Sequence, residues 1–186
     1  EAKALGLSPA QLAQDLGVRM VVGLGAYPAT VPHTRPVTMS VTASTEELAA
    51  IPGLLRGSLD VPAGVQAAIE TRCADLDLPA VGLWAQVPHY VSGEMAPYPA
   101  AALALIEQLE RTAGLRLPKG QLPSETERTR NRIDAAMANN ADHLNLLHNL
   151  EQRHDEQLAA GVGVADGPLP SADELAEEVE RFLRDQ

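Results

Sequence analysis

Two apolar segments that resemble each other constrain the fold more than any other feature of this sequence. Residues 18–24 and 80–86 share the string Val-Gly-Leu, and each is followed by a proline-containing loop that carries a histidine. Short apolar segments of this length are typical of buried β-strands. If the strands are parallel neighbours, both loops leave the same edge of the sheet, where open α/β folds usually bind ligands. The pattern therefore predicts a site that contains His33 and His89.

Helix starts are marked by four serines, each of which stands three residues before a Glu or Gln. In this capping box the serine hydroxyl accepts a hydrogen bond from a backbone N–H, and the later side chain returns to the cap. We expect helices to begin just after these caps, which are Ser8, Ser44, Ser124 and Ser171. This assignment gives the serines a structural role and removes them as catalytic nucleophiles.

The order of the expected elements indicates an α/β fold. The strands are separated by helices, which favours a mostly parallel sheet with flanking helices. Three strands are fewer than the about five or six of an ordinary sheet. Because the sequence begins at Glu1 rather than Met, we expect the N-terminal part of the sheet to be missing from this chain. The expected elements are helix 9–16, strand 18–24, strand 37–43, helix 45–51, helix 64–76, strand 80–86 and helix 99–113.

The character of the sequence changes at Ser124. Residues 125–160 are helix-like, with apolar side chains at spacings of three, four and eight, and such a stripe needs a partner surface. We therefore predict an α/β domain at 1–123 and a helical extension at 124–186 that contains a linker at 161–170. The stripe consists of Ile133, Met137, Ala141, Leu144, Leu147, Leu150 and Leu158.

The charge of the chain argues against two classes of partner. The formal net charge is −11 over 186 residues, and an acidic surface repels nucleic acid and anionic membranes. No apolar run is long enough to cross a membrane, and no signal peptide opens the sequence.

Cys73 is the single cysteine of the chain, which fits a reducing cytoplasm. We expect its thiol to be buried on the inner face of a helix.

Familiar catalytic and cofactor motifs do not occur in the sequence. The Gly-Leu-Gly string at 23–25 is not followed by the third glycine and helix start of a dinucleotide site, and neither a P-loop nor a Gly-x-Ser-x-Gly elbow is present. His143, His148 and His154 are separated by five and six residues, whereas zinc ligands on one helix face recur at i and i+4. We therefore predict no catalytic residue, no metal and no cofactor.

The two proline–histidine loops are the remaining candidates for a site. His33 and His89 could act as acid and base, or could hold an anion together with Arg35. Alternatively, a ring nitrogen of each histidine makes a hydrogen bond that fixes its own loop. We assign His33, Arg35, His89 and Tyr90 as candidate ligand-binding residues. Because neither a nucleophile nor a metal accompanies them, a rigid recognition surface is favoured over an enzyme.

Strings in these loops and in the tail resemble the PAC2 family, the proteasome assembly chaperone 2 family, and most closely its actinobacterial members. They are Val-Pro-His-Thr-Arg-Pro at 31–36, Val-Pro-His-Tyr-Val at 87–91, Pro-Tyr-Pro-Ala at 97–100 and Leu-Pro-Ser-Ala-Asp-Glu-Leu at 169–175. The resemblance covers most of residues 18–186. It implies an α/β domain with a mostly parallel sheet, a helical C-terminal extension, self-association and a non-enzymatic, chaperone-like role in protein assembly.

Two hypotheses about function follow. The leading one is a cytoplasmic, non-enzymatic oligomeric protein that binds other proteins or assists their assembly, and that associates through the helical extension. The alternative is a small-ligand binding protein or an enzyme with a site at the His33 and His89 loops. Proteasome assembly chaperones can dock through a C-terminal hydrophobic-Tyr-any tripeptide. This sequence ends in Arg-Asp-Gln at 184–186, so docking by that route is not expected.

Overall fold

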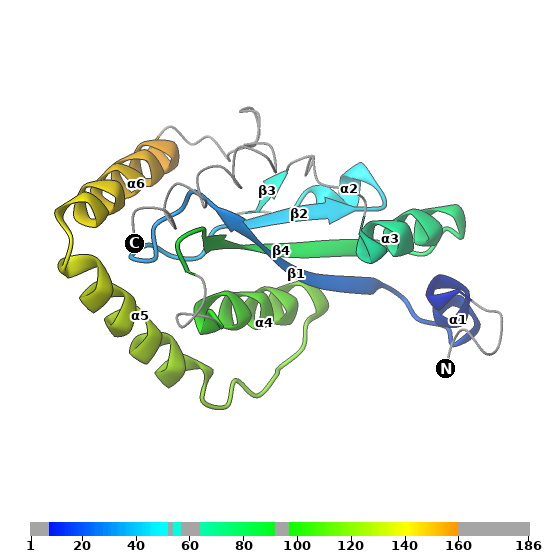
Figure 1. The fold of residues 1–186 in the computed structure, drawn as a ribbon. Coiled ribbons are helices and arrows are strands. Elements are labelled where there is room, and N and C mark those ends of the chain that lie inside the picture. Colours follow the sequence, from blue (N-terminus) through cyan, green and yellow to red (C-terminus); the bar gives the residue numbers. More distant parts are fainter. Residues whose placement is uncertain (1–7, 52–53, 57–63, 92–96, 160–186) are drawn as a thin grey trace.

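The computed structural model describes residues 8–51, 54–56, 64–91 and 97–159. It has an α/β fold with a central sheet, α4 across one face of the sheet, and α5 and α6 around one end (Figure 1). The predicted fold class is therefore confirmed. The described elements are α1 (Pro9–Asp15), β1 (Val21–Ala29), β2 (Met39–Ala43), α2 (Glu46–Ala49), β3 (Leu55–Arg56), α3 (Val65–Asp75), β4 (Ala80–Pro88), α4 (Pro99–Ala113), α5 (Leu122–Ala138) and α6 (Ala141–Ala159).

Within the described residues the sheet has four strands, in the order β1-β4-β2-β3. β1 and β4 pair in parallel from Val21 opposite Ala80 to Ala29 opposite Pro88. β3 is also parallel to its neighbour β2, whereas β2 is antiparallel to β4. The antiparallel pair arises because the loop from β1 to β2 contains no helix that could carry the chain across the sheet, so the chain turns back. Two of the three pairings are thus parallel.

The two long strands extend further than the sequence predicts. β1 ends at Ala29 rather than at residue 24, and β4 ends at Pro88 rather than at residue 86. Proline inside a sheet is confined to edge strands, and Pro28 fits this rule because β1 has a neighbour on one side only in the described part of the chain. That upstream residues supply further strands of the sheet stays a prediction.

The main hydrophobic core lies between the sheet and α4. Side chains of β2 and β4 that point to one face pack against α4, whose bounds agree with the predicted 99–113. The helix starts with Pro99 in its first turn and ends at Gly114, whose φ of 67° is a left-handed conformation that glycine adopts at low cost. The buried members of this core are Met39, Val41, Val81, Leu83, Ala85, Ala101 and Leu105.

The opposite face of the sheet is polar and is shaped by glycines. A Cβ on Gly25 would lie 2.4 Å from the ring of Trp84, so the glycine leaves the space that the indole occupies beside β1. The indole N–H of Trp84 donates to Thr42 at 3.1 Å. The hydroxyl of Tyr27 is 2.8 Å from Ser40 Oγ and accepts a hydrogen bond from the Gln86 side chain at 2.9 Å. These contacts satisfy polar groups of the strands on the face away from α4.

A second, smaller core holds α1 and α3 against the sheet. Cys73 has no exposed surface and packs with Ala10, Leu78 and Ala80. Burial raises the pKa of its thiol, with a smaller contribution from the charge of Glu70. The predicted buried cysteine is therefore confirmed, and the thiol is an inert part of the packing.

The predicted serine caps are partly confirmed. Ser8 accepts from the N–H of Gln11 and caps α1 as predicted. Ser44 does not cap α2, because Thr45 takes that position and the Ser44 hydroxyl accepts instead from the N–H of Ala80 in β4. Ser124 lies inside the first turn of α5, which begins at Leu122, three residues earlier than predicted. Ser171 and the predicted linker 161–170 lie outside the described residues.

The predicted helix 125–160 is two helices rather than one. Asn139 ends α5, and the side-chain oxygen of Asn140 accepts from the N–H of Asp142 at the start of α6. Asparagine is favoured at such ends because its side chain competes with the helix for backbone groups. The break divides the apolar stripe, so its members do not share one straight face.

Candidate functional site

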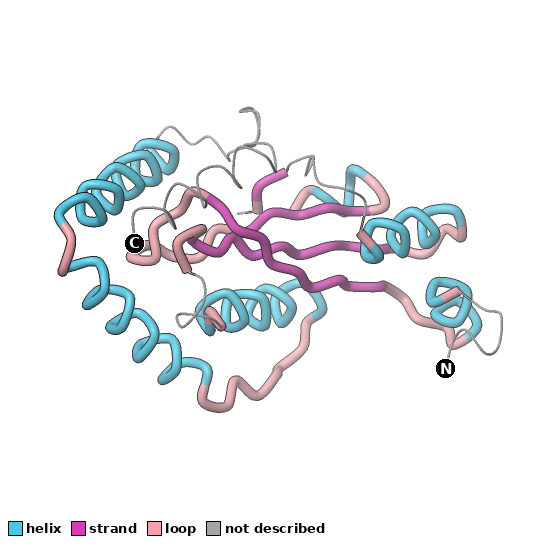
Figure 2. The backbone as a smooth tube through the Cα atoms, in the orientation of Figure 1, coloured by secondary structure: helices cyan, strands magenta, loops and turns pink. Residues whose placement is uncertain are grey.

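The loops that follow β1 and β4 lie at the same end of the sheet, on the side of α5 and α6 (Figure 2). The parallel register predicts this arrangement, because Ala29 and Pro88 are partners at the ends of the two strands. The loops touch through His33 and Tyr90. The backbone N–H of His33 donates to the Tyr90 hydroxyl at 2.9 Å, and its ring Nδ1 is 2.8 Å from the same oxygen.

The His33 ring joins the loop to a helix on its other side. Its Nε2 lies 2.9 Å from a carboxylate oxygen of Asp134 on α5. A carboxylate only accepts hydrogen bonds, so Nε2 carries a proton and donates it. In the neutral ring Nδ1 then accepts from the Tyr90 hydroxyl, and both nitrogens are satisfied. The His33 side chain has no exposed surface, so neither nitrogen is available to a ligand in this arrangement.

His89 is held in a different way. Its backbone N–H donates to the carbonyl of Ala29 at 3.0 Å, and its Nδ1 is 3.4 Å from that same oxygen. Its ring meets the Tyr90 ring edge-on, with centroids 5.3 Å apart, while His33 meets Tyr90 edge-on at 5.8 Å. Edge-to-face packing at these separations is favourable. Tyr90 is therefore the shared contact of the two histidines.

Arg35 turns toward α6. Its guanidinium makes a two-point contact with Asp155, at 2.8 Å from Nε and 2.7 Å from Nη2, and a third contact with Glu151 at 3.1 Å. Hydrogen bonds from Arg35 lower the pKa of Asp155 to about 2, and the same contact raises the pKa of Arg35. Thr34 also donates to Glu151. Ion pairs therefore hold the loop that follows β1 against α6.

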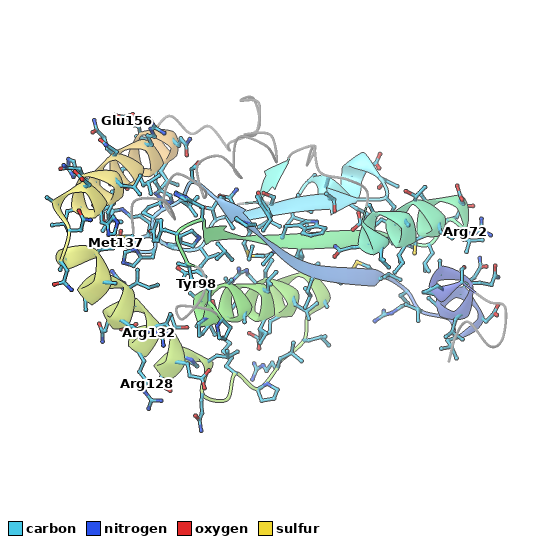
Figure 3. All side chains as sticks on the ribbon, viewed as in Figure 1. Arg72, Tyr98, Arg128, Arg132, Met137 and Glu156 are labelled. Carbon is cyan, nitrogen blue, oxygen red and sulfur yellow. The ribbon has the colours of Figure 1, made fainter. Side chains whose placement is uncertain are left out.

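Tyr90 also anchors a third hydrophobic core, between the loops and the C-terminal helices. Tyr90 is 1% exposed and packs with Ile133, Met137 and Leu150, which belong to the predicted stripe. Burial raises the pKa of Tyr90, so its phenol stays protonated at neutral pH. Figure 3 shows Met137 on the side of α5 that faces the sheet, whereas Arg128 and Arg132 lie on its outer side. Part of the stripe therefore finds its partner surface within this chain.

The structure brings three of the four candidate site residues together. His33, His89 and Tyr90 form one contact group, while Arg35 points away from it to the carboxylates of α6. Their ligand-binding role stays a prediction. Among the residues that the structure describes, no group of three or more His, Cys, Asp or Glu side chains could hold a metal ion.

Sequence reasoning missed the acidic partners of this site. Glu151 and Asp155 are four residues apart on one helix, which puts both carboxylates on one face, where Arg35 contacts both of them. That spacing is a signal the sequence does carry. Asp134 has no comparable signal except that it follows Ile133, a member of the buried stripe.

The proline–histidine loops, the sheet that positions them and the helix that carries Asp134 all lie within a region that matches a known family. The PAC2 family matches residues 9–137. The chain belongs to the PAC2 family. Glu151 and Asp155 lie beyond the matched residues, so the Arg35 contact joins the family region to a helix outside that match.

Solved structures of actinobacterial proteins agree with this assignment. A Mycobacterium tuberculosis protein of unknown function is 35% identical, with a TM-score of 0.73, over 82% of this chain and 51% of that chain. A proteasome-assembly chaperone homologue from the same organism is 32% identical, with a TM-score of 0.66, over 80% and 58%. A PAC2 family protein from Streptomyces avermitilis is 34% identical, with a TM-score of 0.65, over 78% and 58%. This chain therefore spans between about half and three fifths of the length of these proteins.

No match was found among the curated proteins. Within the described ranges, none of the helices combines the length and the apolar character needed to cross a membrane.

Proposed function

We propose that this protein is a non-enzymatic, chaperone-like binding protein of the cytoplasm that assists protein assembly. Its membership of the PAC2 family supports this role, and so does its similarity to a protein described as a proteasome-assembly chaperone homologue. The observation that carries the proposal is the state of His33. Its side chain is fully buried, and its two nitrogens are occupied by Tyr90 and Asp134.

The contacts at the two loops support a structural purpose for them. A general acid or base must come within hydrogen-bond reach of its substrate, and His33 makes its hydrogen bonds to the protein itself. The loops hold α5 and α6 against the sheet, and these helices extend around the sheet end as an arm (Figure 1). An arm held in one position is a suitable surface for recognition of another protein.

The surface of the arm supports self-association as part of this function. Leu144 is 47% exposed and Leu158 is 67% exposed, although both belong to the apolar stripe. Leu150 and Met137, by contrast, are buried in the third core. We assign the exposed members of the stripe to contacts with a second copy or with the protein that is assembled.

Light scattering on the full chain tests the self-association. The expected result is a mass that is a multiple of the monomer mass and that falls in Leu144→Glu and Leu158→Glu. Leu115→Glu is the matched control, because Leu115 is 49% exposed but lies in the connection between α4 and α5. A monomeric wild-type chain, or an equal effect of the control, would contradict association through the arm.

One relative is described as a proteasome-assembly chaperone homologue, so we propose the proteasome as the protein that is assembled. Reconstitution with proteasome subunits tests this partner. Purified subunits from the source organism would be mixed with and without the full chain, and assembled particles would be followed on native gels. The proposal expects a stable complex with a subunit or an intermediate, and faster appearance of assembled particles. An unchanged time course without any complex would contradict the proposed proteasome partner.

A further inference from the structure

A cavity beside the His33 loop has features that the contacts described above do not use. It lies between this loop, α4 and α5 and has a volume of about 470 Å³. Small-ligand sites commonly measure about 300–1,000 Å³, so a small molecule or the end of a chain fits. The apolar part of its lining includes Val37, Met39, Tyr98, Ala100, Leu103 and Ala104.

Arg111 lines this cavity and is held by a neutral acceptor. Its Nε and Nη2 both donate to the amide oxygen of Gln108, at 3.0 and 2.7 Å. Gln108 is 4% exposed, and its amide nitrogen donates to Thr112 at 3.2 Å. Because an amide oxygen fixes the guanidinium without neutralising it, Arg111 keeps its full charge. No carboxylate within the described ranges forms an ion pair with it.

Arg130 supplies a second charge of the same kind. Its Nη2 lies 3.5 Å from the carbonyl oxygen of Thr34, another residue of the lining. As for Arg111, the described part of the chain contains no ion pair to Arg130. Arg35 also lines the cavity, but Glu151 and Asp155 neutralise its charge. Two of the three lining arginines thus lack a carboxylate partner.

A buried hydroxyl of the lining also lacks a partner. Thr126 Oγ1 is shielded from solvent and makes no hydrogen bond to any described residue. A buried polar atom without a partner is uncommon and calls for an explanation. Thr126 belongs to α5 and lines the cavity with the two arginines. Because its hydroxyl is shielded from solvent, the two guanidinium groups are the donors of this set that a bound anion reaches in this arrangement.

Two carboxylates also line the cavity and limit the positive charge. Glu107 is paired with Lys119 at 3.1 Å and is largely neutralised. Glu127 is exposed and lies three residues from Arg130 on α5. Counting unpaired lining charges leaves two arginines against one glutamate, which favours a ligand with a single negative charge.

We propose that this cavity binds a carboxylate that carries a small apolar body. The guanidinium groups of Arg111 and Arg130 would hold the carboxylate, and the apolar wall of α4 and β2 would hold the body. Arginine suits this role because its planar fork matches the geometry of a carboxylate. The carboxylate can belong to a free small acid or to the C-terminal residue of a polypeptide, and these sources share the same chemistry.

The direct test uses N-acetyl-leucine and its uncharged amide as probes of the full chain. Binding would be measured by calorimetry and by shifts of backbone amide resonances in an isotopically labelled sample. We expect N-acetyl-leucine to bind and to shift resonances of α4, α5 and the His33 loop, whereas the amide does not. No binding at millimolar concentrations, or equal binding of acid and amide, would overturn the proposal.

Substitutions of the lining residues test whether the ligand binds in this cavity. Arg130→Gln and Arg111→Gln are each expected to weaken binding about tenfold, because each removes a charged hydrogen bond. Arg128→Gln is the matched control, since Arg128 lies on the outer side of α5 (Figure 3) and should bind as the wild type does. Glu127→Gln should strengthen binding about threefold by removing a nearby negative charge.

The binding affinities of these variants show whether the ligand binds in this cavity or is attracted by positive charge anywhere on the protein surface. Weaker binding in Arg128→Gln to the same degree as in Arg130→Gln would show a nonspecific electrostatic effect and would overturn the site. A third probe, 4-methylpentanoate, distinguishes the sources. Equal affinity for this free acid supports a small metabolite-like ligand, and a clear preference for N-acetyl-leucine supports a chain terminus.

Discussion

The two proline–histidine loops look alike in sequence but are held by different parts of their histidines. His33 uses its ring, which links Tyr90 of the other loop to Asp134 of α5. His89 relies chiefly on its backbone N–H, which donates to Ala29 beside it. The first loop therefore connects distant parts of the fold, whereas the second mainly continues the pairing of β1 with β4. Similar strings after paired strands need not have equivalent roles.

The largest difference between the loops should appear when each histidine is removed. His33→Ala is expected to lower the free energy of unfolding by about 3 kcal/mol, because it empties a buried position and removes two hydrogen bonds. His89→Ala should cost about 1 kcal/mol, since the backbone contact to Ala29 remains. Urea denaturation of both variants measures the difference. Equal losses would show that the loops are equivalent after all.

Removal of the hydroxyl that the loops share is the next test. Tyr90→Phe leaves the His33 N–H and Nδ1 without their partner in a buried place, so we expect a loss of about 2 kcal/mol. Tyr98→Phe is the matched control, because Tyr98 packs against the same core and its hydroxyl makes no hydrogen bond within the described residues. It should change stability by less than about 0.5 kcal/mol. A similar loss in both variants would assign the effect to packing.

The Arg35 contact with α6 should have a smaller effect than either change above. Arg35→Gln removes the charged contacts to Glu151 and Asp155, which lie at a partly exposed surface. The expected loss in urea denaturation is modest, and it should shrink further at about 1 M salt because the charges are screened. Arg132→Gln, on the outer side of α5 (Figure 3), should leave stability unchanged. A salt-independent loss would contradict an electrostatic origin.

The smallest expected effect is a pH dependence of the first loop. The pKa of Asp155 is lowered from its ordinary 3.8 to about 2, so its contribution is fully present above about pH 4 and is lost as pH falls toward 2. Asp155→Asn should therefore reduce the loss of stability over this range. Unfolding measured from pH 5 to pH 2 in both proteins gives the comparison. Identical pH profiles would show that the ion pair does not stabilise the folded state.

Much of the framework could be predicted from local patterns. The helix Pro99–Ala113 was predicted at its true bounds, because Pro99 suits a first turn and Gly114 suits a left-handed end. The meeting of the two loops followed from parallel strands of matching length. The continuous helix 125–160 was not correct, because Asn139 and Asn140 end one helix and begin another without interrupting the apolar spacing.

The sequence by itself determined the α/β class, most helices and strands, the PAC2 family and the end of the sheet at which both histidines lie. Only the tertiary structure decided what those histidines do. Asp134 lies 101 residues after His33, and Asp155 lies 120 residues after Arg35. Local periodicity specifies which face of a helix is apolar, but it holds no information about which distant carboxylate will come within 3 Å of a given ring or guanidinium. The distance between these groups depends on how the arm packs around the end of the sheet.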